Sequence, residues 1–199
     1  MKRNPETRER LLEAAQRLFL ERGFQGTSTR DITEAAGANL AAVNYYFRSK
    51  QDLMVAVAER VVAPVLHTQV SRLDELRTRP TPPTVAELVA AYLTPMVEYR
   101  ESGGGEQIAR FISQSMYEDF ESVRRVVDPV EDRFRAELAL TLPDLPTHEL
   151  ELRFRAMIGI FIMYGLGVLT QGQQHSGPAQ LAARITAICA AALTAPASA

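Results

Sequence analysis

The sequence predicts an all-α protein of about nine helices, with three small helices in the first 50 residues and a larger bundle after them. Apolar residues recur at spacings of three and four along most of the chain, which is the period of amphipathic helices. No run of alternating apolar and polar residues is flanked by hairpin turns, so strands are not expected. The chain has 199 residues, 46% of them hydrophobic, and is long enough to bury a substantial core. We therefore expect one domain over residues 1–50 and a helical bundle over residues 51–199.

The first two helices are predicted from an apolar stripe and from turn signals. Gly23 ends the first helix, because glycine suits the position just beyond a helix C-terminus. Ser28 and Asp31 have the S-x-x-D spacing of a capping box, so the second helix begins near Thr29, and Gly37 ends it. The stripe of the first helix consists of Leu11, Leu12, Ala15, Leu18 and Phe19.

The third and fourth helices follow directly. The third begins at residues 39–40 and ends near Phe47. Ser49 and Asp52 repeat the S-x-x-D spacing and begin the fourth helix. Pro64 is expected to kink this helix or to end a segment of it, because proline donates no backbone hydrogen bond and clashes with the preceding turn.

The later helices are separated by segments rich in proline and glycine. Pro129 lies inside one of them, Thr147 can cap another, and Pro178 suits a first helical turn. An uncharged apolar run at 156–170 lies in the helix that Thr147 caps. The breaks are expected at 78–84, 102–106, 142–146 and 172–178, and the helices at 85–96, 108–116, 119–140, 147–170 and 178–193.

Two short helices joined by a glycine-containing turn at 37–39 indicate a helix-turn-helix, whose second helix enters the DNA major groove. Val43 and Phe47 are four residues apart and share a face, which can pack with Ile32 and Ala36 of the preceding helix. This spacing predicts that Phe47 turns inward although two tyrosines precede it.

The opposite face of the third helix is expected to meet DNA. Asn44 can form a bidentate pair with adenine N6 and N7. Tyr45 and Tyr46 can bond phosphates or contact a thymine methyl group, although partial burial in the core is the alternative for both. Small side chains at Ala41 and Ala42 allow the helix to approach the duplex closely.

Three further residues are candidates for phosphate contacts. Lys50, at the start of the fourth helix, can bind phosphate through its charge, with a solvated cation as the alternative. Thr29 and Arg30 stand at the start of the second helix, and Arg30 could also reach a base edge. Arg48 is expected to be a solvated surface residue.

The block from Thr7 to Leu53 resembles the N-terminal domain of the TetR (tetracycline-repressor) family of bacterial transcription regulators. The motifs are A-A-x-x-L-F followed by G-F (14–24), T-S-T-R-D-I (27–32), A-A-G (35–37) and Y-F-x-S-K-x-x-L (46–53). The resemblance implies an all-helical homodimer whose N-terminal domain binds an operator and whose C-terminal bundle dimerises and binds a small effector. The positions that it implies for DNA contact are Thr29, Arg30, Asn39, Leu40, Ala41, Ala42, Asn44, Tyr45, Tyr46 and Lys50.

Some residues depart from the family pattern. Many members have a threonine where Ala42 stands and a tyrosine where Asn44 stands, so a phosphate contact at Ala42 is expected to be lost. The helical wheel puts Leu40 near Val43, whereas the family puts that position near the bases. The stretches 39–47 and 145–161 resemble a sub-branch that includes fatty-acid-responsive repressors, which implies an acyl-type effector.

The charge is distributed with a mild asymmetry, so the basic N-terminal end could meet a polyanion, with a solvated helix face as the alternative, and the composition fits a reducing cytosol. Residues 1–50 contain nine basic and six acidic side chains, a balance of +3, and the remainder contains 13 and 18, a balance of −5. The single cysteine, Cys189, excludes an internal disulfide framework. The N-terminus lacks the apolar region of a signal peptide, and the run at 156–170 is too short to span a bilayer, so no membrane partner is expected.

The bundle offers candidates for an effector pocket and for a dimer seam. Pocket walls are predicted from methionine and aromatic residues, with ordinary core as the alternative: Phe111, Met116, Phe120, Phe161, Met163 and Tyr164. Glycines in the apolar helix permit close approach of another helix or leave room for a ligand: Gly159, Gly165 and Gly167. The resemblance implies a four-helix dimer contact through the last two helices, and these glycines favour it together with a small-residue face on the last helix: Ala182, Ala183, Ala187, Ala190 and Ala191.

Other function classes have less support. The glycine stretch at 102–105 lacks the Lys-Ser/Thr of a phosphate-binding loop and is expected to be a turn. His67, His148 and His175 have no metal-ligand spacing, and Cys189 is expected to be a buried, inert thiol. We therefore expect no cofactor and no enzymatic activity. A DNA-anchored factor whose bundle binds a protein partner, without a small-molecule effector, stays open as an alternative.

Overall fold

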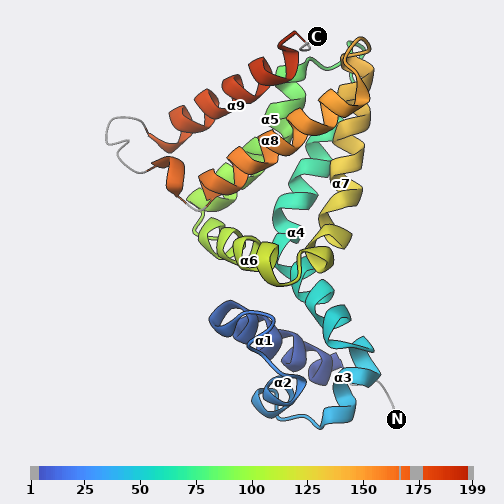
Figure 1. Cartoon of the computed structure of the whole chain (residues 1–199), viewed down its shortest axis with the longest axis vertical. Helices are drawn as coiled ribbons and strands as arrows, with labels where there is room; N and C mark the ends of the chain where they lie inside the picture. The colour runs from blue at the N-terminus through green and yellow to red at the C-terminus, as the bar shows by residue number, and fades with distance from the viewer. Residues whose placement is uncertain (1–4, 166, 171–176, 197–199) are drawn as a thin grey trace. The chain divides into compact units, whose positions relative to one another are not determined.

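The structure is a computed structural model that describes residues 5–165, 167–170 and 177–196. The described residues form nine α-helices, one short 3₁₀ helix and no strand, which confirms the all-α prediction (Figure 1). The elements are α1 (Pro5–Arg22), α2 (Thr29–Ala35), α3 (Leu40–Phe47), α4 (Lys50–Arg77), α5 (Val85–Glu101), α6 (Gly105–Glu118), α7 (Phe120–Thr141), α8 (Thr147–Gly165), η1 (Val168–Thr170) and α9 (Pro178–Thr194).

The chain forms two compact units. The first consists of Met1–Ala63 and Arg110–Val127, and the second of Pro64–Ala109 and Asp128–Ala199. Helices α4, α6 and α7 each contribute residues to both units. The predicted boundary at residue 50 falls inside the first unit and stays a prediction about function.

In the first unit, α1, α2 and α3 pack against one another around a small apolar core. The capping box at the start of α2 is confirmed, because the Asp31 N–H donates to the Ser28 hydroxyl at 3.1 Å and the Ser28 N–H donates to the Asp31 carboxylate at 2.8 Å. The first N–H groups of a helix have no acceptor within the helix, and the Ser28 and Asp31 side chains supply acceptors for two of these N–H groups. The core of this part is formed by Leu11, Ala15, Leu18, Phe19, Ile32, Val43, Phe47 and Leu53.

A single tight turn joins α3 to α4. Arg48 has φ 68° and ψ −45°, and the Ser49 N–H donates to the Phe47 carbonyl at 2.8 Å, which is the pattern of a γ-turn with positive φ. The Asp52 N–H donates to the Ser49 hydroxyl at 3.0 Å, so the predicted cap of α4 is confirmed. This turn determines where the end of α3 meets the start of α4.

In the second unit, α9 packs along α5 and α8, and an aromatic cluster fills the interior. The Tyr92 ring lies 5.1 Å from that of Phe134 and 5.5 Å from that of Phe154, centroid to centroid. The Tyr92 hydroxyl donates to the Glu131 carboxylate at 3.3 Å. Burial, followed by the nearby charge of Glu131, raises the pKa of Tyr92. The cluster therefore places a carboxylate against a buried, neutral phenol.

Two predictions about helix ends were settled by local geometry. Pro64 does not end α4, which continues to Arg77. The predicted helix over 147–170 was too long, because α8 ends at Gly165 and Val168–Thr170 is a separate 3₁₀ turn. Gly167 has φ +76°, a left-handed conformation incompatible with continuing an α-helix.

Helix α4 is the one described helix with the length and apolar composition that could cross a membrane. Of its most apolar window, 44% is buried inside the structure. One such helix is weak evidence for a membrane span, because the core helix of a folded domain passes the same test of length and composition.

Candidate nucleic-acid interface

The turn between α2 and α3 is built by glycine and by backbone hydrogen bonds. Gly37 has φ +59°, and a Cβ added there would meet no atom within 4 Å, so its backbone conformation alone makes glycine suitable. The Ala38 N–H donates to the Thr33 carbonyl at 2.9 Å, which closes the end of α2. Asn39 has the extended backbone of an N-cap and starts α3. These contacts form the predicted helix-turn-helix.

The inner face of α3 holds the helix to α1 and α2. Val43 is fully buried and Phe47 is 5% exposed, as their spacing predicted, and Ile32 and Ala36 are buried with them. Ala42 is also buried, at 5% exposure, so the expectation that it faces DNA is corrected. The buried stripe of α3 is wide enough to include the residue beside Val43, because this short helix packs against two neighbours.

The outer face of α3 consists of exposed, uncharged residues. Leu40 is 58% exposed and Tyr45 is 38% exposed, and Ala41 and Asn44 are exposed between them. Leu40 therefore points away from the core, as the family position implies and against the helical wheel. Asn39 is exposed too and makes no side-chain cap bond.

Tyr46 lies at the margin of this face. It is half-buried, and its ring stands edge-on to that of Tyr45, with 4.9 Å between centroids and 88° between planes. The two tyrosines thus differ in burial, because Tyr45 is exposed and Tyr46 is half-buried.

The predicted phosphate contacts have different surroundings. Arg30 is exposed in the first turn of α2, and Thr29 beside it is half-buried. The Lys50 ammonium donates to the Phe24 carbonyl at 2.6 Å and lies 4.0 Å from the centroid of the Phe24 ring. Burial lowers the pKa of Lys50, whereas the charges of Asp119 and Glu118 oppose the change. In the structure, Lys50 therefore binds the turn between α1 and α2.

The same turn is held by the end of α6 within the first unit. The Gln25 N–H donates to the Glu118 carboxylate at 2.9 Å, and the Gln25 side-chain amide donates to the Glu118 carbonyl at 3.4 Å. A Cβ at Gly23 would overlap the Glu118 carboxylate. Sequence reasoning missed this contact, because no local spacing relates residues 93 positions apart.

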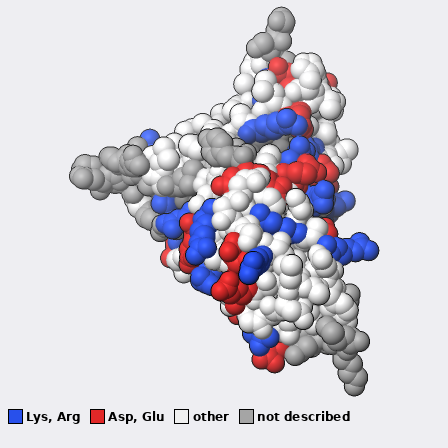
Figure 2. Space-filling model, turned by 60° about the horizontal axis from the view of Figure 1, so that its bottom comes forward, with Lys and Arg blue, Asp and Glu red and all other residues white. Residues whose placement is uncertain are grey.

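Charge on the surface is mixed. On the face that Figure 2 presents, basic and acidic side chains lie side by side, with uncharged areas between them. Helix α3 contains no acidic or basic residue in its first or last turn. Any DNA contact by α3 must therefore use amides, hydroxyls and apolar groups, with phosphate attraction supplied by neighbouring elements.

The predicted effector-pocket residues are divided between the two units. Phe111 is buried and Phe120 is 41% exposed in the first unit. In the second unit, Phe161 and Tyr164 are buried, and Met163 is 39% exposed. The side chain of Met116 lies outside the described part of the chain. The Arg100 guanidinium lies 5.0 Å from the centroid of the Tyr164 ring and also donates to the Tyr164 carbonyl, so that pair closes the end of α8.

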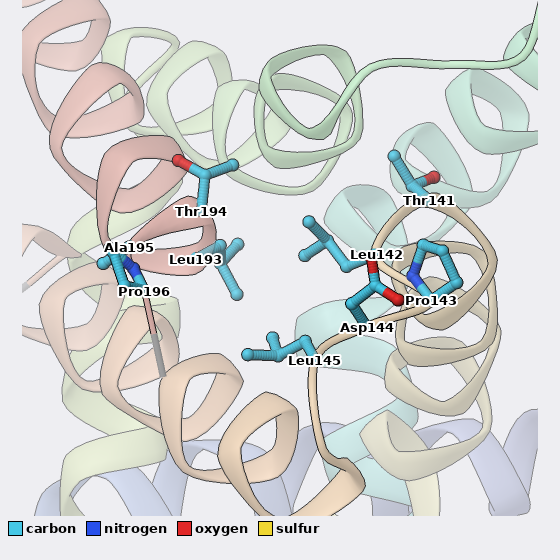
Figure 3. A pocket seen from close by; sticks show the side chains of 9 residues that line it. All are labelled: Thr141, Leu142, Pro143, Asp144, Leu145, Leu193, Thr194, Ala195 and Pro196. Carbon is cyan, nitrogen blue, oxygen red and sulfur yellow. The ribbon is translucent and has the colours of Figure 1, made fainter. Parts of the chain in front are cut away.

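One described pocket of the second unit lies where the α7–α8 loop meets the end of α9, with a volume of about 290 Å³ (Figure 3). Leu142, Leu145 and Leu193 point into it from both sides. A second, of about 380 Å³, lies between α4 and α5. None of the six predicted residues lines either pocket, so their role stays a prediction.

Helices α8 and α9 expose apolar and small side chains. On α8, Leu152 is 63% exposed, and Gly159 has no atom within 4 Å of where its Cβ would be. On α9, Ile188 is 59% exposed. The predicted small-residue face divides: Ala183, Ala187 and Ala191 are exposed, Ala190 is half-buried and Ala182 is buried.

The residues considered for metal or thiol chemistry lie apart. His67 and His148 are exposed on different helices, and His175 lies outside the described residues. In the described ranges no three His, Cys, Asp or Glu side chains gather in a metal-binding arrangement. Cys189 is fully buried, as predicted, and burial raises the pKa of its thiol.

Two family models match this chain. Residues 11–57 match the model described as bacterial regulatory proteins, tetR family, and residues 90–192 match the tetracyclin repressor-like C-terminal domain. Among curated proteins, the chain is 26% identical to a probable HTH-type transcriptional regulator, YttP, of Bacillus subtilis, over 76% of each chain. It is 27% identical to the HTH-type transcriptional dual regulator CecR of Shigella flexneri, over 81% of this chain and 77% of that one.

Solved structures share the fold. The fatty acid degradation regulator FadR from Bacillus halodurans superposes with a TM-score of 0.63 at 14% identity, covering 98% of this chain and 97% of that one. A tetR-family transcriptional regulator from Streptomyces coelicolor superposes with a TM-score of 0.58 at 22% identity, covering 96% of this chain and 81% of that one. With a helix-turn-helix at its N-terminus and a matching C-terminal domain, the chain belongs to the TetR family of DNA-binding transcriptional regulators.

Proposed function

We propose that this protein is a dimeric repressor that a small apolar effector releases from a palindromic operator. The observation that supports DNA recognition best is the two-sided character of α3. Its inner face is buried by Val43 and Phe47, and its outer face exposes Leu40, Asn44 and Tyr45. A helix held in this way can enter the major groove without disturbing the core.

The DNA contacts that we propose follow from position and chemistry. Asn44 and the outer residues Asn39, Leu40 and Ala41 face the bases. Phosphates are contacted from the flanks by the hydroxyl groups of the two tyrosines and from the start of α2: Thr29, Arg30, Tyr45 and Tyr46. Lys50 reaches a phosphate only if it leaves the Phe24 carbonyl, so we propose that its larger role is to position the start of α4.

The dimer that we propose joins α8 and α9 of two copies. Exposed Leu152 and Ile188, together with open space at Gly159, give two helices an apolar surface without a partner in one copy. Two-fold symmetry then places two copies of α3 on half-sites one helical turn apart, about 34–36 Å. We infer a cytoplasmic location, where such DNA is found, and no catalytic activity.

The effector that we propose is apolar and of acyl type, bound in the second unit. The sub-branch resemblance of the sequence supports this class, and the fold shared with a regulator named for fatty acid degradation is compatible with it. For the effector to release the protein from DNA, its affinity must differ between two conformations. Its affinity for the conformation that cannot bind DNA must be higher than its affinity for the DNA-binding conformation. A melting-shift screen with fatty acids and acyl-CoAs tests this class of effector. If no compound of either series raises the melting temperature, the acyl class is refuted.

A mobility-shift assay tests the DNA site. Asn44→Ala and Tyr45→Ala should each lower operator affinity while the melting temperature stays within error, because both side chains are exposed. Gln107→Ala, which removes an exposed amide from α6, is the matched control and should bind like the wild type. Unchanged binding by both α3 variants would refute the assignment of this face.

A further inference from the structure

The recognition face of α3 lacks every charged side chain. All eight residues of α3, LAAVNYYF, are described, and none is Lys, Arg, Asp or Glu. The side chains exposed on it are a leucine, an alanine, an asparagine and a tyrosine. The chemistry available to read a base edge is therefore narrow.

That chemistry discriminates between base pairs. Guanine is read most often by bidentate Arg or Lys at O6 and N7, and cytosine by Asp or Glu at N4, and α3 offers neither. Adenine is read by the amide of Asn or Gln, and thymine by apolar contact with its 5-methyl group. Asn44 supplies the first of these groups, and Leu40 supplies the second.

We propose that α3 specifies A·T base pairs, with Leu40 packed on a thymine 5-methyl group and Asn44 paired with an adenine. This inference rests on the proposed function, since it concerns the same DNA face. Leu40 and Asn44 are four residues apart, so they lie on one side of the helix, about 6 Å apart along its axis. That separation corresponds to about two base-pair steps of 3.4 Å, so the two contacts fall on base pairs two steps apart, with one pair between them.

The exposure of Leu40 supports this role. Leu40 is 58% exposed although it is among the larger apolar side chains. Leucine cannot donate or accept a hydrogen bond, so the thymine methyl is the group on a base edge in the major groove that it can recognise. Arg30 lies on α2, outside this face, so guanine readout is expected only at the flanks of each half-site.

The test begins with the full-length protein and a random duplex pool, from which the preferred operator is selected. The centre of each half-site should consist of A·T pairs. Each central thymine is then replaced by deoxyuridine, which lacks only the 5-methyl group. For the wild type, affinity should fall about fourfold at one or two positions, the effect of one methyl group removed from a buried contact.

Variants assign that loss to a side chain. Leu40→Ala should bind the thymine operator more weakly and should be insensitive to deoxyuridine, whereas Leu40→Met should keep most of the sensitivity. Asn44→Ala should lose discrimination at an adenine two base-pair steps from that thymine, on the order of tenfold or more. Leu140→Ala, which shortens another exposed leucine on α7, should behave like the wild type.

Three results distinguish a failure of the A·T inference from a failure of the proposed function on which it rests. If no sequence is selected and no duplex is bound selectively, the proposed function fails, and the inference fails with it. If selective binding occurs with G·C pairs at the centre, the inference alone is overturned. If Leu40→Ala and the wild type lose equal affinity on deoxyuridine, Leu40 is not the reader of the methyl group, and the inference is likewise overturned.

Discussion

The Lys50 ammonium donates a hydrogen bond to the Phe24 carbonyl at 2.6 Å and lies 4.0 Å from the centroid of the Phe24 ring. The two residues join the first turn of α4 to the loop between α1 and α2. A cation above an aromatic face and a charge-assisted hydrogen bond act here on one ammonium group. The position of this lysine after the Y-F-x-S motif predicted a phosphate contact, and the structure offers a second role within the protein.

The first prediction separates these two roles of Lys50. Lys50→Met keeps most of the apolar stem of the side chain and removes the charge. It should lower the free energy of unfolding by about 1–2 kcal/mol, the contribution of a partly exposed hydrogen bond from a charged group. The salt dependence of operator affinity should stay unchanged. If the slope of log affinity against log salt concentration instead fell by about one, the ammonium would bind a phosphate in the complex.

The second prediction concerns the contact between Gly23 and Glu118. Gly23 has φ +75°, and a Cβ there would overlap the Glu118 carboxylate that accepts the Gln25 N–H. Gly23→Ala should therefore destabilise the protein by at least about 1 kcal/mol, from backbone strain alone. Chemical denaturation measures this loss.

A double variant measures how much of the lost stability comes from the overlap between the new Cβ and the Glu118 carboxylate. Adding Glu118→Ala to Gly23→Ala removes the overlapping atoms, so the pair should be less destabilised than the sum of the single variants. Strict additivity would mean that only the backbone conformation at Gly23 matters.

The third prediction is a pH dependence at the start of α5. Hydrogen bonds from the Thr84 N–H, Arg79 and the Thr84 hydroxyl lower the pKa of Glu87 to about 2. A carboxyl whose pKa is lower in the folded state stabilises the fold above its unfolded pKa of 4.5, and this contribution is lost as the pH falls from 4.5 towards 2. Glu87→Gln should therefore be less stable than the wild type at pH 7, and the difference should shrink over that range.

Melting temperatures between pH 7 and pH 2.5 measure this difference. Glu59→Gln changes an exposed glutamate of α4 and is the matched control for the loss of one carboxylate. A Glu87→Gln difference from the wild type that does not change between pH 7 and pH 2.5 would contradict the role of Glu87 in the cap.

The fourth prediction concerns the dimer. Gly159→Arg and Ile188→Asp each place a charge on the exposed surface of α8 or α9, where a second copy is proposed to pack, and should shift the protein from dimer to monomer in sedimentation experiments. Neither change should unfold the single copy, because Gly159 has open space around it and Ile188 is 59% exposed. Leu140→Asp alters an apolar residue that is 76% exposed on α7 and should leave the dimer intact. Dimers that persist in both variants would exclude this surface.

The helices themselves were predictable because their signals are local. The capping boxes, the stripe that buries Val43 and Phe47, and the glycine at the α2–α3 turn all act within a few residues, through hydrogen bonds and side-chain neighbours of fixed spacing. The T-x-x-E spacing of Thr84 and Glu87 contained the same signal for α5. The predicted end of the helix over 147–170 was wrong because the backbone conformation of one glycine, Gly167, is incompatible with continuing α8.

The helical class, the helix-turn-helix and the motifs that resemble one family of regulators could all be inferred from the order of residues, because periodicity, caps and turn residues act locally. Only the tertiary structure decided between the helical wheel and the family position for Leu40, which is exposed, and revealed that Ala42 is buried, since α3 packs against both α1 and α2. It also decided that Lys50 binds the Phe24 carbonyl, 26 residues away, and that Glu118 binds Gln25, 93 residues away. Contacts between residues so far apart depend on how the helices pack, which no local spacing specifies.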